Sequence, residues 1–166
     1  DTTAAQRTMM IAMLSMAFVT VFVQAVVLQR WKASPATMLK TGFGVMTIAL
    51  LLLAFGPGLA SLYLGYGLFG LSFGFTAPGL NAAGSLSVQR EEQGAVAGVI
   101  LFFTAVAAAA GPLAMAAVSD AGGSLRHGFA LATAFAGLLA LGLLYNGIAD
   151  PAAPRLAARE ARGTGA

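Results

Sequence analysis

The chain has 166 residues, of which 58% are hydrophobic and only 9% are charged. A soluble domain usually carries about 25% charged residues, so this composition excludes an ordinary water-soluble fold and indicates a membrane protein. The net charge of +3 comes from a few basic residues in loops and tails, with no basic stripe, which argues against nucleic-acid binding. The absence of cysteine excludes a disulfide framework and a thiolate metal site.

Five apolar stretches predict an all-α fold, a polytopic bundle of transmembrane helices. About 18 consecutive apolar residues are enough for a helix to cross the ~30 Å hydrocarbon core of a bilayer. The expected spans, in chain order, are about 8–28, 36–55, 59–80, 95–118 and 129–145. Residues 150–166 form a polar tail that we expect to be cytoplasmic and disordered at its end.

Short polar or helix-breaking segments separate these spans. Ser34 followed by Pro35 is typical of a helix start, because the hydroxyl caps free N–H groups and proline at the first helical position loses no hydrogen bond. The Gly-Pro-Gly sequence at 56–58 predicts a tight turn that makes spans two and three a helical hairpin. Glu91 and Glu92 precede the positive N-terminal end of the fourth span.

Basic residues predict the orientation, because cytoplasmic loops carry the excess of lysine and arginine. Five spans place the two termini on opposite sides of the membrane. One side receives seven basic residues and the other receives two: Arg30, Lys32, Lys40, Arg90, Arg155, Arg159 and Arg162 against Arg7 and Arg126. We therefore expect the N-terminus outside and the C-terminus in the cytoplasm.

Side-chain size predicts which helices are central. The second span contains four consecutive leucines at 50–53 and the fifth is also leucine-rich, so we expect both to be peripheral and to face lipid. The third and fourth spans are rich in small residues, which let membrane helices approach closely, and should be central. Static packing and a moving interface both fit this pattern. The residues expected to pack closely or to bend a helix are Gly70, Gly74, Pro78, Gly94, Gly98, Gly111 and Pro112.

The spans offer polar side chains but no titratable group at membrane depth, where a proton relay would need one. The hydroxyl groups are expected mainly to form interhelical hydrogen bonds. For Gln24 and Asn81, which cost more to bury, substrate contact and interhelical bonding remain equally open. An enzyme is not expected, because no nucleophile, base and metal cluster come together in the sequence.

One region resembles a known family. Pro78-Gly79-Leu80-Asn81 ends a glycine-rich span, then follow Gln89-Arg90-Glu91-Glu92-Gln93-Gly94, Gly98 and Gly111-Pro112. This is similar to the segment that joins helices ten and eleven of the major facilitator superfamily, especially its twelve-helix drug and tetracycline proton antiporters. By this resemblance the five spans correspond to helices eight to twelve, and Arg90, Glu91 and Glu92 form the cytoplasmic loop motif.

The resemblance implies a secondary transporter of the bacterial inner membrane that works by alternating access and exports a small organic molecule. Its partners would be the lipid bilayer, that substrate and the seven preceding helices, which this chain lacks; no cofactor or metal is implied. The side chains expected to line the substrate cavity are Gln24, Tyr66, Asn81, Phe102 and Thr104. The alternative is a small non-transporting membrane protein or the remnant of a broken transporter gene.

Overall fold

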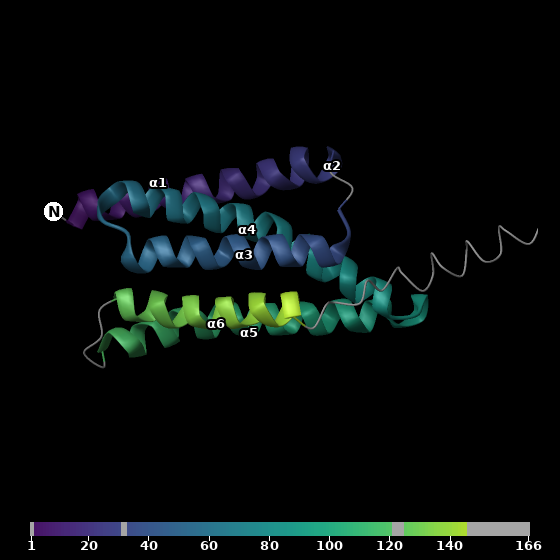
Figure 1. Ribbon diagram of the computed structural model, residues 1–166. Helices are drawn as coiled ribbons and strands as arrows, with labels where there is room; N and C mark the ends of the chain where they lie inside the picture. Colours follow the sequence, from purple (N-terminus) through teal and green to yellow (C-terminus); the bar gives the residue numbers. More distant parts are fainter. Residues whose placement is uncertain (1, 31–32, 121–124, 146–166) are drawn as a thin grey trace, which may run out of the picture.

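The computed structural model describes residues 2–30, 33–120 and 125–145, and this part of the chain is helical apart from short connections (Figure 1). The predicted all-α fold is therefore confirmed. The elements are α1 (Thr2–Phe22), a π-helical segment η1 (Val23–Val27), α2 (Leu28–Arg30), α3 (Pro35–Phe55), α4 (Gly58–Ser87), a 3-10 turn η2 (Arg90–Glu92), α5 (Gln93–Asp120) and α6 (Leu125–Tyr145).

Four helical segments of the described residues are long and apolar enough to cross a membrane: Thr2–Arg30, Pro35–Phe55, Gly58–Ser87 and Arg90–Val118. They cover the first four predicted spans. The fifth predicted span corresponds to α6, whose apolar part, His127–Gly142, is shorter. The predicted polar tail lies outside the described residues.

The helix ends follow the local signals of the sequence. The Ser34 hydroxyl accepts a hydrogen bond from the Thr37 backbone N–H (3.3 Å), and Pro35 is the first residue of α3, as predicted. The turn at 56–58 joins α3 directly to α4 and confirms the hairpin. Gly58 has φ +76°, a left-handed conformation that costs other residues roughly 1–2 kcal/mol.

Helix α4 is central, as predicted, because it packs against α1 through one set of small residues and against α3 through another. On the α1 side, a Cβ atom added to Gly70 would clash with the Met16 backbone, and one added to Gly74 would lie 2.8 Å from Val23 Cβ. The Thr20 hydroxyl donates a hydrogen bond to the Gly70 carbonyl oxygen (3.0 Å) across this contact. The backbones of α1 and α4 are therefore close enough to touch.

Helix α3 is also central, so its predicted peripheral position is wrong. It packs against α4 along much of its length and against α6 on another side. Leu50 is only 6% exposed, and a Cβ atom added to Gly65 would lie 2.7 Å from Leu53 Cδ2. The leucines that suggested a lipid-facing helix partly fill the space that the glycines of α4 leave open, while Leu51 remains 43% exposed.

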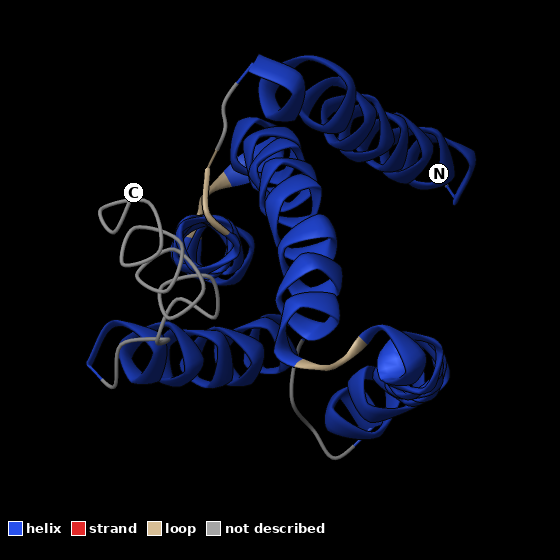
Figure 2. Ribbon diagram, turned by 90° about the vertical axis from the view of Figure 1, so that its right-hand side faces the viewer, coloured by secondary structure: helices blue, strands red, loops and turns tan. Residues whose placement is uncertain are grey.

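Helix α5, predicted to be central, contains no buried residue among those described, so that prediction is wrong for this chain. Gly94, Gly98 and Gly111 have open space where a Cβ atom would be. The contacts of α5 lie toward its ends, where Ile100 approaches Gly84 of α4 and Met115 approaches Gly128 of α6. The helices are tilted to different degrees, some seen nearly end-on and others obliquely in Figure 2, and α5 contacts its neighbours over short stretches only.

Helix α6 has one buried face and one exposed face, in agreement with its predicted position at the edge of the bundle. Thr133 (8% exposed) and Ala136 (4%) are buried, and α6 packs mainly on α3. Leu131 and Leu138, in contrast, are more than 60% exposed. The leucine-rich surface is therefore the one available to lipid.

The open space at Gly111 gives a prediction opposite to the one from the sequence. Gly111→Leu should not destabilise this chain and should raise its free energy of unfolding by up to about 1 kcal/mol, because a Cβ atom there has no neighbour within 4 Å and leucine has the higher helix propensity. Gly84→Leu is the matched variant: a Cβ atom there would lie 2.8 Å from Ile100 Cδ1 and 3.0 Å from Val96 Cγ1, so the larger side chain must displace these two side chains of α5 and should lower the free energy of unfolding. Unfolding in mixed micelles, followed by circular dichroism, compares the two. An equal loss at both positions would mean that α5 is packed at Gly111.

Candidate functional site

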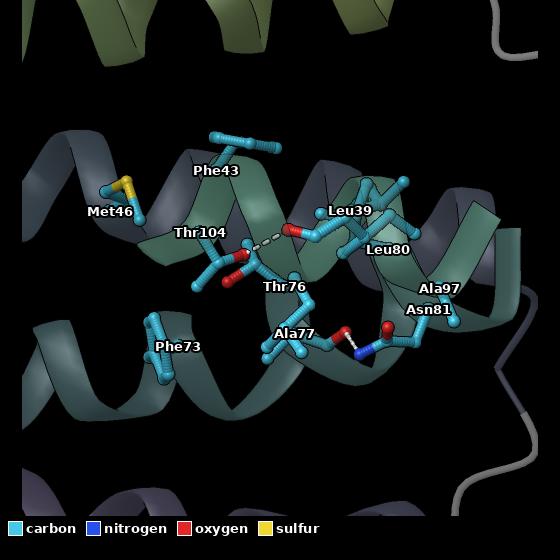
Figure 3. A pocket seen from close by; sticks show the side chains of 12 residues that line it. Leu39, Phe43, Met46, Phe73, Thr76, Ala77, Leu80, Asn81, Ala97 and Thr104 are labelled. Atoms are coloured by element: carbon cyan, nitrogen blue, oxygen red, sulfur yellow. Dashed lines mark hydrogen bonds between the residues drawn. The ribbon is translucent and has the colours of Figure 1, made fainter. Parts of the chain in front are cut away.

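A pocket of about 330 Å³ lies between α3, α4 and α5 (Figure 3). Its volume falls within the range of about 300–1,000 Å³ that is common for small-molecule sites. The lining residues are Leu39, Phe43 and Met46 of α3; Phe73, Thr76, Ala77, Leu80 and Asn81 of α4; and Ala97, Ile100, Leu101 and Thr104 of α5. We call it the α3–α4–α5 pocket.

Each helix contributes one face to this pocket. On α3, for example, Leu39, Phe43 and Met46 follow the spacing i, i+4, i+7, which places three side chains on the same side of a helix. Residues 73, 77 and 80 of α4 and residues 97, 101 and 104 of α5 repeat this spacing. The pocket is thus formed where three apolar helix faces converge without filling the space between them.

The pocket has a buried floor and an exposed rim. Leu39 (6% exposed) and Thr76 (9%) are buried. Phe73 (43%), Leu80 (46%) and Leu101 (70%) lie on the surface of the bundle. A ligand could therefore reach the floor from the side of the bundle.

Three polar side chains face this otherwise apolar space, and each of them already donates one hydrogen bond to a carbonyl oxygen of its own helix. The Thr104 hydroxyl donates to the Ile100 carbonyl oxygen (2.7 Å) and the Asn81 amide donates to the Ala77 carbonyl oxygen (2.9 Å), both visible in Figure 3. The Thr76 hydroxyl donates to the Ser72 carbonyl oxygen (3.1 Å). The oxygen atoms of all three side chains retain lone pairs that can accept a hydrogen bond.

The pocket lies in the half of the helices next to the loop at 88–92. At 1.5 Å per residue, Asn81 is roughly 9 Å from the C-terminal end of α4, and Thr104 is roughly 16 Å from the N-terminal end of α5. The pocket thus extends from near one helix end to about the middle of the membrane-crossing length.

The structure brings two of the five predicted cavity residues together, Asn81 and Thr104. Phe102 is on the same helix as Thr104 but is 62% exposed and stacks edge-on against Phe103 (ring centroids 5.5 Å apart). Tyr66 is half-buried on α4 outside the pocket, and Gln24 is exposed within η1. Phe102, Tyr66 and Gln24 therefore do not share a site with Asn81 and Thr104.

Sequence reasoning missed the α3 wall of the pocket, because that helix was expected to face lipid. The available signal was the i, i+4, i+7 spacing of Leu39, Phe43 and Met46, which indicates a shared face but not what it faces. Lys40, which the charge pattern assigns to the cytoplasmic side, lies in the second turn of α3 and is half-buried. Its long apolar stem can follow the helix while the amine reaches the boundary.

The loop motif connects α4 to α5 without forming part of the pocket. Arg90, Glu91 and Glu92 make the 3-10 turn η2 and are all exposed. The Glu92 backbone N–H donates to the Gln89 carbonyl oxygen (3.1 Å), and the Gln93 amide donates to the Ser85 carbonyl oxygen (3.2 Å). These bonds fix the start of α5 relative to the end of α4.

Among the described residues, no three or more histidine, cysteine, aspartate or glutamate side chains come together in a way that could hold a metal ion. Comparison of the chain with protein-family models, with curated proteins and with solved structures found no match. In the part of the chain that the structure describes, the fold is a helical bundle in which four helices are long and apolar enough to cross a membrane.

Proposed function

We propose that the chain is the C-terminal helical part of a secondary transporter of the major facilitator type, and that it helps to export a small organic molecule. The observation that carries the proposal is the α3–α4–α5 pocket, a ligand-sized space with three polar groups between helices that can cross a membrane. The arginine-glutamate-glutamate loop and the Gly-Pro step within α5 add sequence support.

In this proposal the substrate is bound between helices whose partners rock around it, as in alternating access. The close contact of α1 with α4 at Gly70 would let these two helices move as one unit. Within the described residues of α4 and α5, acidic side chains occur only at the end of α5, at Asp120. Proton coupling through a carboxylate would therefore use a group from other helices of the same transporter.

Flux measurements test the proposal. Inside-out vesicles from cells expressing the complete reading frame that contains this chain should accumulate a lipophilic dye when a pH gradient is imposed. Proteoliposomes that contain this chain alone should show only the flux of empty vesicles, because the coupling group lies elsewhere. Gradient-driven uptake by the chain alone would place the coupling group within it. No uptake in either preparation would favour the alternative, a small non-transporting membrane protein.

The proposed orientation, with the N-terminus outside and the C-terminus in the cytoplasm of a bacterial inner membrane, has its own test. Single cysteines at Pro57 and Thr3 should react with a membrane-impermeant thiol reagent in intact cells, whereas cysteines at Gln29 and Gln89 should react only after the membrane is opened. All four side chains are exposed, and the chain has no cysteine of its own, so labelling reports the side of the membrane alone. The reverse pattern would invert the topology.

A further inference from the structure

We propose that three methionines in the first half of α1 form a binding site for a soft monovalent metal ion of the Cu(I) type. The chain has seven methionines, and four of them lie between residues 9 and 16 of this helix. Met9, Met10 and Met13 line one open hollow on the surface of α1. This methionine site is separate from the α3–α4–α5 pocket, and it does not depend on the transport proposal.

Helix geometry brings the three sulfur atoms toward one point. Met13 follows Met9 by four residues and Met10 by three, spacings at which side chains on a helix are neighbours, with Cβ atoms about 5–6 Å apart. Long side chains on a helix lean toward its N-terminus, so the Met13 thioether lies over the turn that carries Met9 and Met10. The three rotatable bonds of each methionine let the sulfur atoms close around one small ion.

The three side chains are not held by packing within the bundle. Met9, Met10 and Met13 are 42%, 57% and 58% exposed, whereas Ala12 in the same stretch of helix is completely buried. Their sulfur atoms can therefore turn toward an ion without disturbing the contact between α1 and α4.

The donor atoms determine which ion binds. A thioether is a soft ligand that suits Cu(I), whereas Mg²⁺ and Ca²⁺ prefer oxygen ligands. Among the described residues, no cluster of three or more histidine, cysteine, aspartate or glutamate side chains offers another kind of metal site. Thioethers are also uncharged, so they do not offset the cost of removing an ion from water, which is lower for a monovalent ion than for a divalent one.

Binding at this site should not depend on pH. A thiol, an imidazole or a carboxyl group must lose a proton to bind a metal ion, but a thioether carries none. Arg7 is the only charged residue of α1, its side chain is exposed, and arginine does not titrate in proteins. Helix α4, on which α1 packs, contains no acidic, basic or histidine residue.

The position of the site makes it accessible to a hydrated ion. The helical segment Thr2–Arg30 has 29 residues and is therefore about 43 Å long, which exceeds the ~30 Å hydrocarbon core of a bilayer. Met9 is roughly 10 Å from the N-terminal end of this segment. The methionine site thus lies near the boundary between headgroups and hydrocarbon, on the side of the N-terminus.

Titration with silver nitrate tests the proposal, because Ag(I) has the same preference for sulfur as Cu(I) and is stable in air. The chain, with its methionine methyl groups labelled with carbon-13, is reconstituted in phosphatidylcholine nanodiscs in chloride-free buffer. Of the seven methyl signals in the NMR spectrum, those of Met9, Met10 and Met13 should shift and saturate together. The binding curve should be the same at about pH 5 and about pH 7.5, and zinc nitrate should shift none of the three.

Two matched variants locate the site. Met13→Leu should weaken Ag(I) binding by about 10-fold or more, since even a residue that only orients a metal ligand changes affinity by roughly 10- to 100-fold. Met16→Leu makes the same substitution one turn further along α1, outside the hollow, and should leave the affinity unchanged. Leucine has nearly the volume and the helix propensity of methionine, so both variants should fold, which circular dichroism checks.

Several outcomes would overturn the proposal. Shifts that do not saturate, or that spread equally over all seven methyl signals, would mean that the three methionines do not form a site. Equal weakening in Met13→Leu and Met16→Leu would contradict the assignment of the ligands. Loss of binding at the lower pH would identify an imidazole or a carboxylate as the ligand in place of the thioethers.

Discussion

Replacing Gly70 by alanine will force α1 away from α4 and destabilise the bundle by about 1–3 kcal/mol, the usual cost of overpacking. The new methyl group would overlap the carbonyl group and Cα of Met16, which are backbone atoms and cannot turn aside as a flexible side chain can. The hydrogen bond from the Thr20 hydroxyl to the Gly70 carbonyl oxygen (3.0 Å) would lengthen as the helices separate. Unfolding of the chain in mixed micelles, followed by circular dichroism, measures the loss.

Gly67→Ala is the matched control, one turn earlier on the same helix. A Cβ atom at Gly67 meets no atom within 4 Å, so the substitution adds only helix propensity and should stabilise the chain by up to about 1 kcal/mol. The two identical substitutions should therefore have effects of opposite sign. If Gly70→Ala were as stable as Gly67→Ala, α1 and α4 would not be in backbone contact, and α4 would lose its place between α1 and α3.

The prediction at Gly70 illustrates what the sequence could supply. Its glycine spacing indicated a helix that others approach closely, and hydrophobicity together with Ser34-Pro35 and Gly-Pro-Gly located the spans and their ends. These signals are local, because they depend on side-chain size, backbone freedom and capping within a few residues. The described helices follow them closely for that reason.

The pairing of helices could not be read in the same way. A run of four leucines such as that of α3 is typical of a lipid-facing helix, but a bulky face also packs well when its partner is small, as Leu53 does beside Gly65. Conversely, the glycines and alanines of α5 permit close packing without requiring a neighbour, and Gly94, Gly98 and Gly111 have none in this chain. Size complementarity is a property of two helices, and one sequence stretch specifies only half of it.

For the same reason, the sequence predicts only part of the candidate site. Polarity at membrane depth favours Asn81 and Thr104 as cavity residues, and the structure places both at one pocket. Gln24 met the same criterion but lies on another helix, where the π-helical segment Val23–Val27 changes the register of its side chains. The depth of a residue in the membrane can be counted along the sequence. The direction in which its side chain points depends on helix geometry and on which helix faces pack together.

Replacing Ser72 by alanine will stabilise the chain by about 1 kcal/mol, contrary to the usual effect of a substitution in a packed interior. Ser72 is 0% exposed, and its hydroxyl oxygen has no hydrogen-bond partner in the part of the chain that the structure describes. A buried polar group without a partner costs about 1–3 kcal/mol of desolvation, and alanine removes that group while leaving almost the same volume. Alanine also has the higher helix propensity.

Ser61→Ala provides the comparison, because Ser61 is also buried on α4 (8% exposed) but donates a hydrogen bond to the Gly58 carbonyl oxygen (2.8 Å). Removing that bond at the start of the helix should cost about 1 kcal/mol, so the two serine substitutions should differ in sign. Midpoints of unfolding in mixed micelles give both values from one series. A loss of stability in Ser72→Ala would mean that its hydroxyl is bonded in the membrane, and the contact of α4 with Gly42 of α3, which the Ser72 backbone approaches, would need to be rebuilt around that bond.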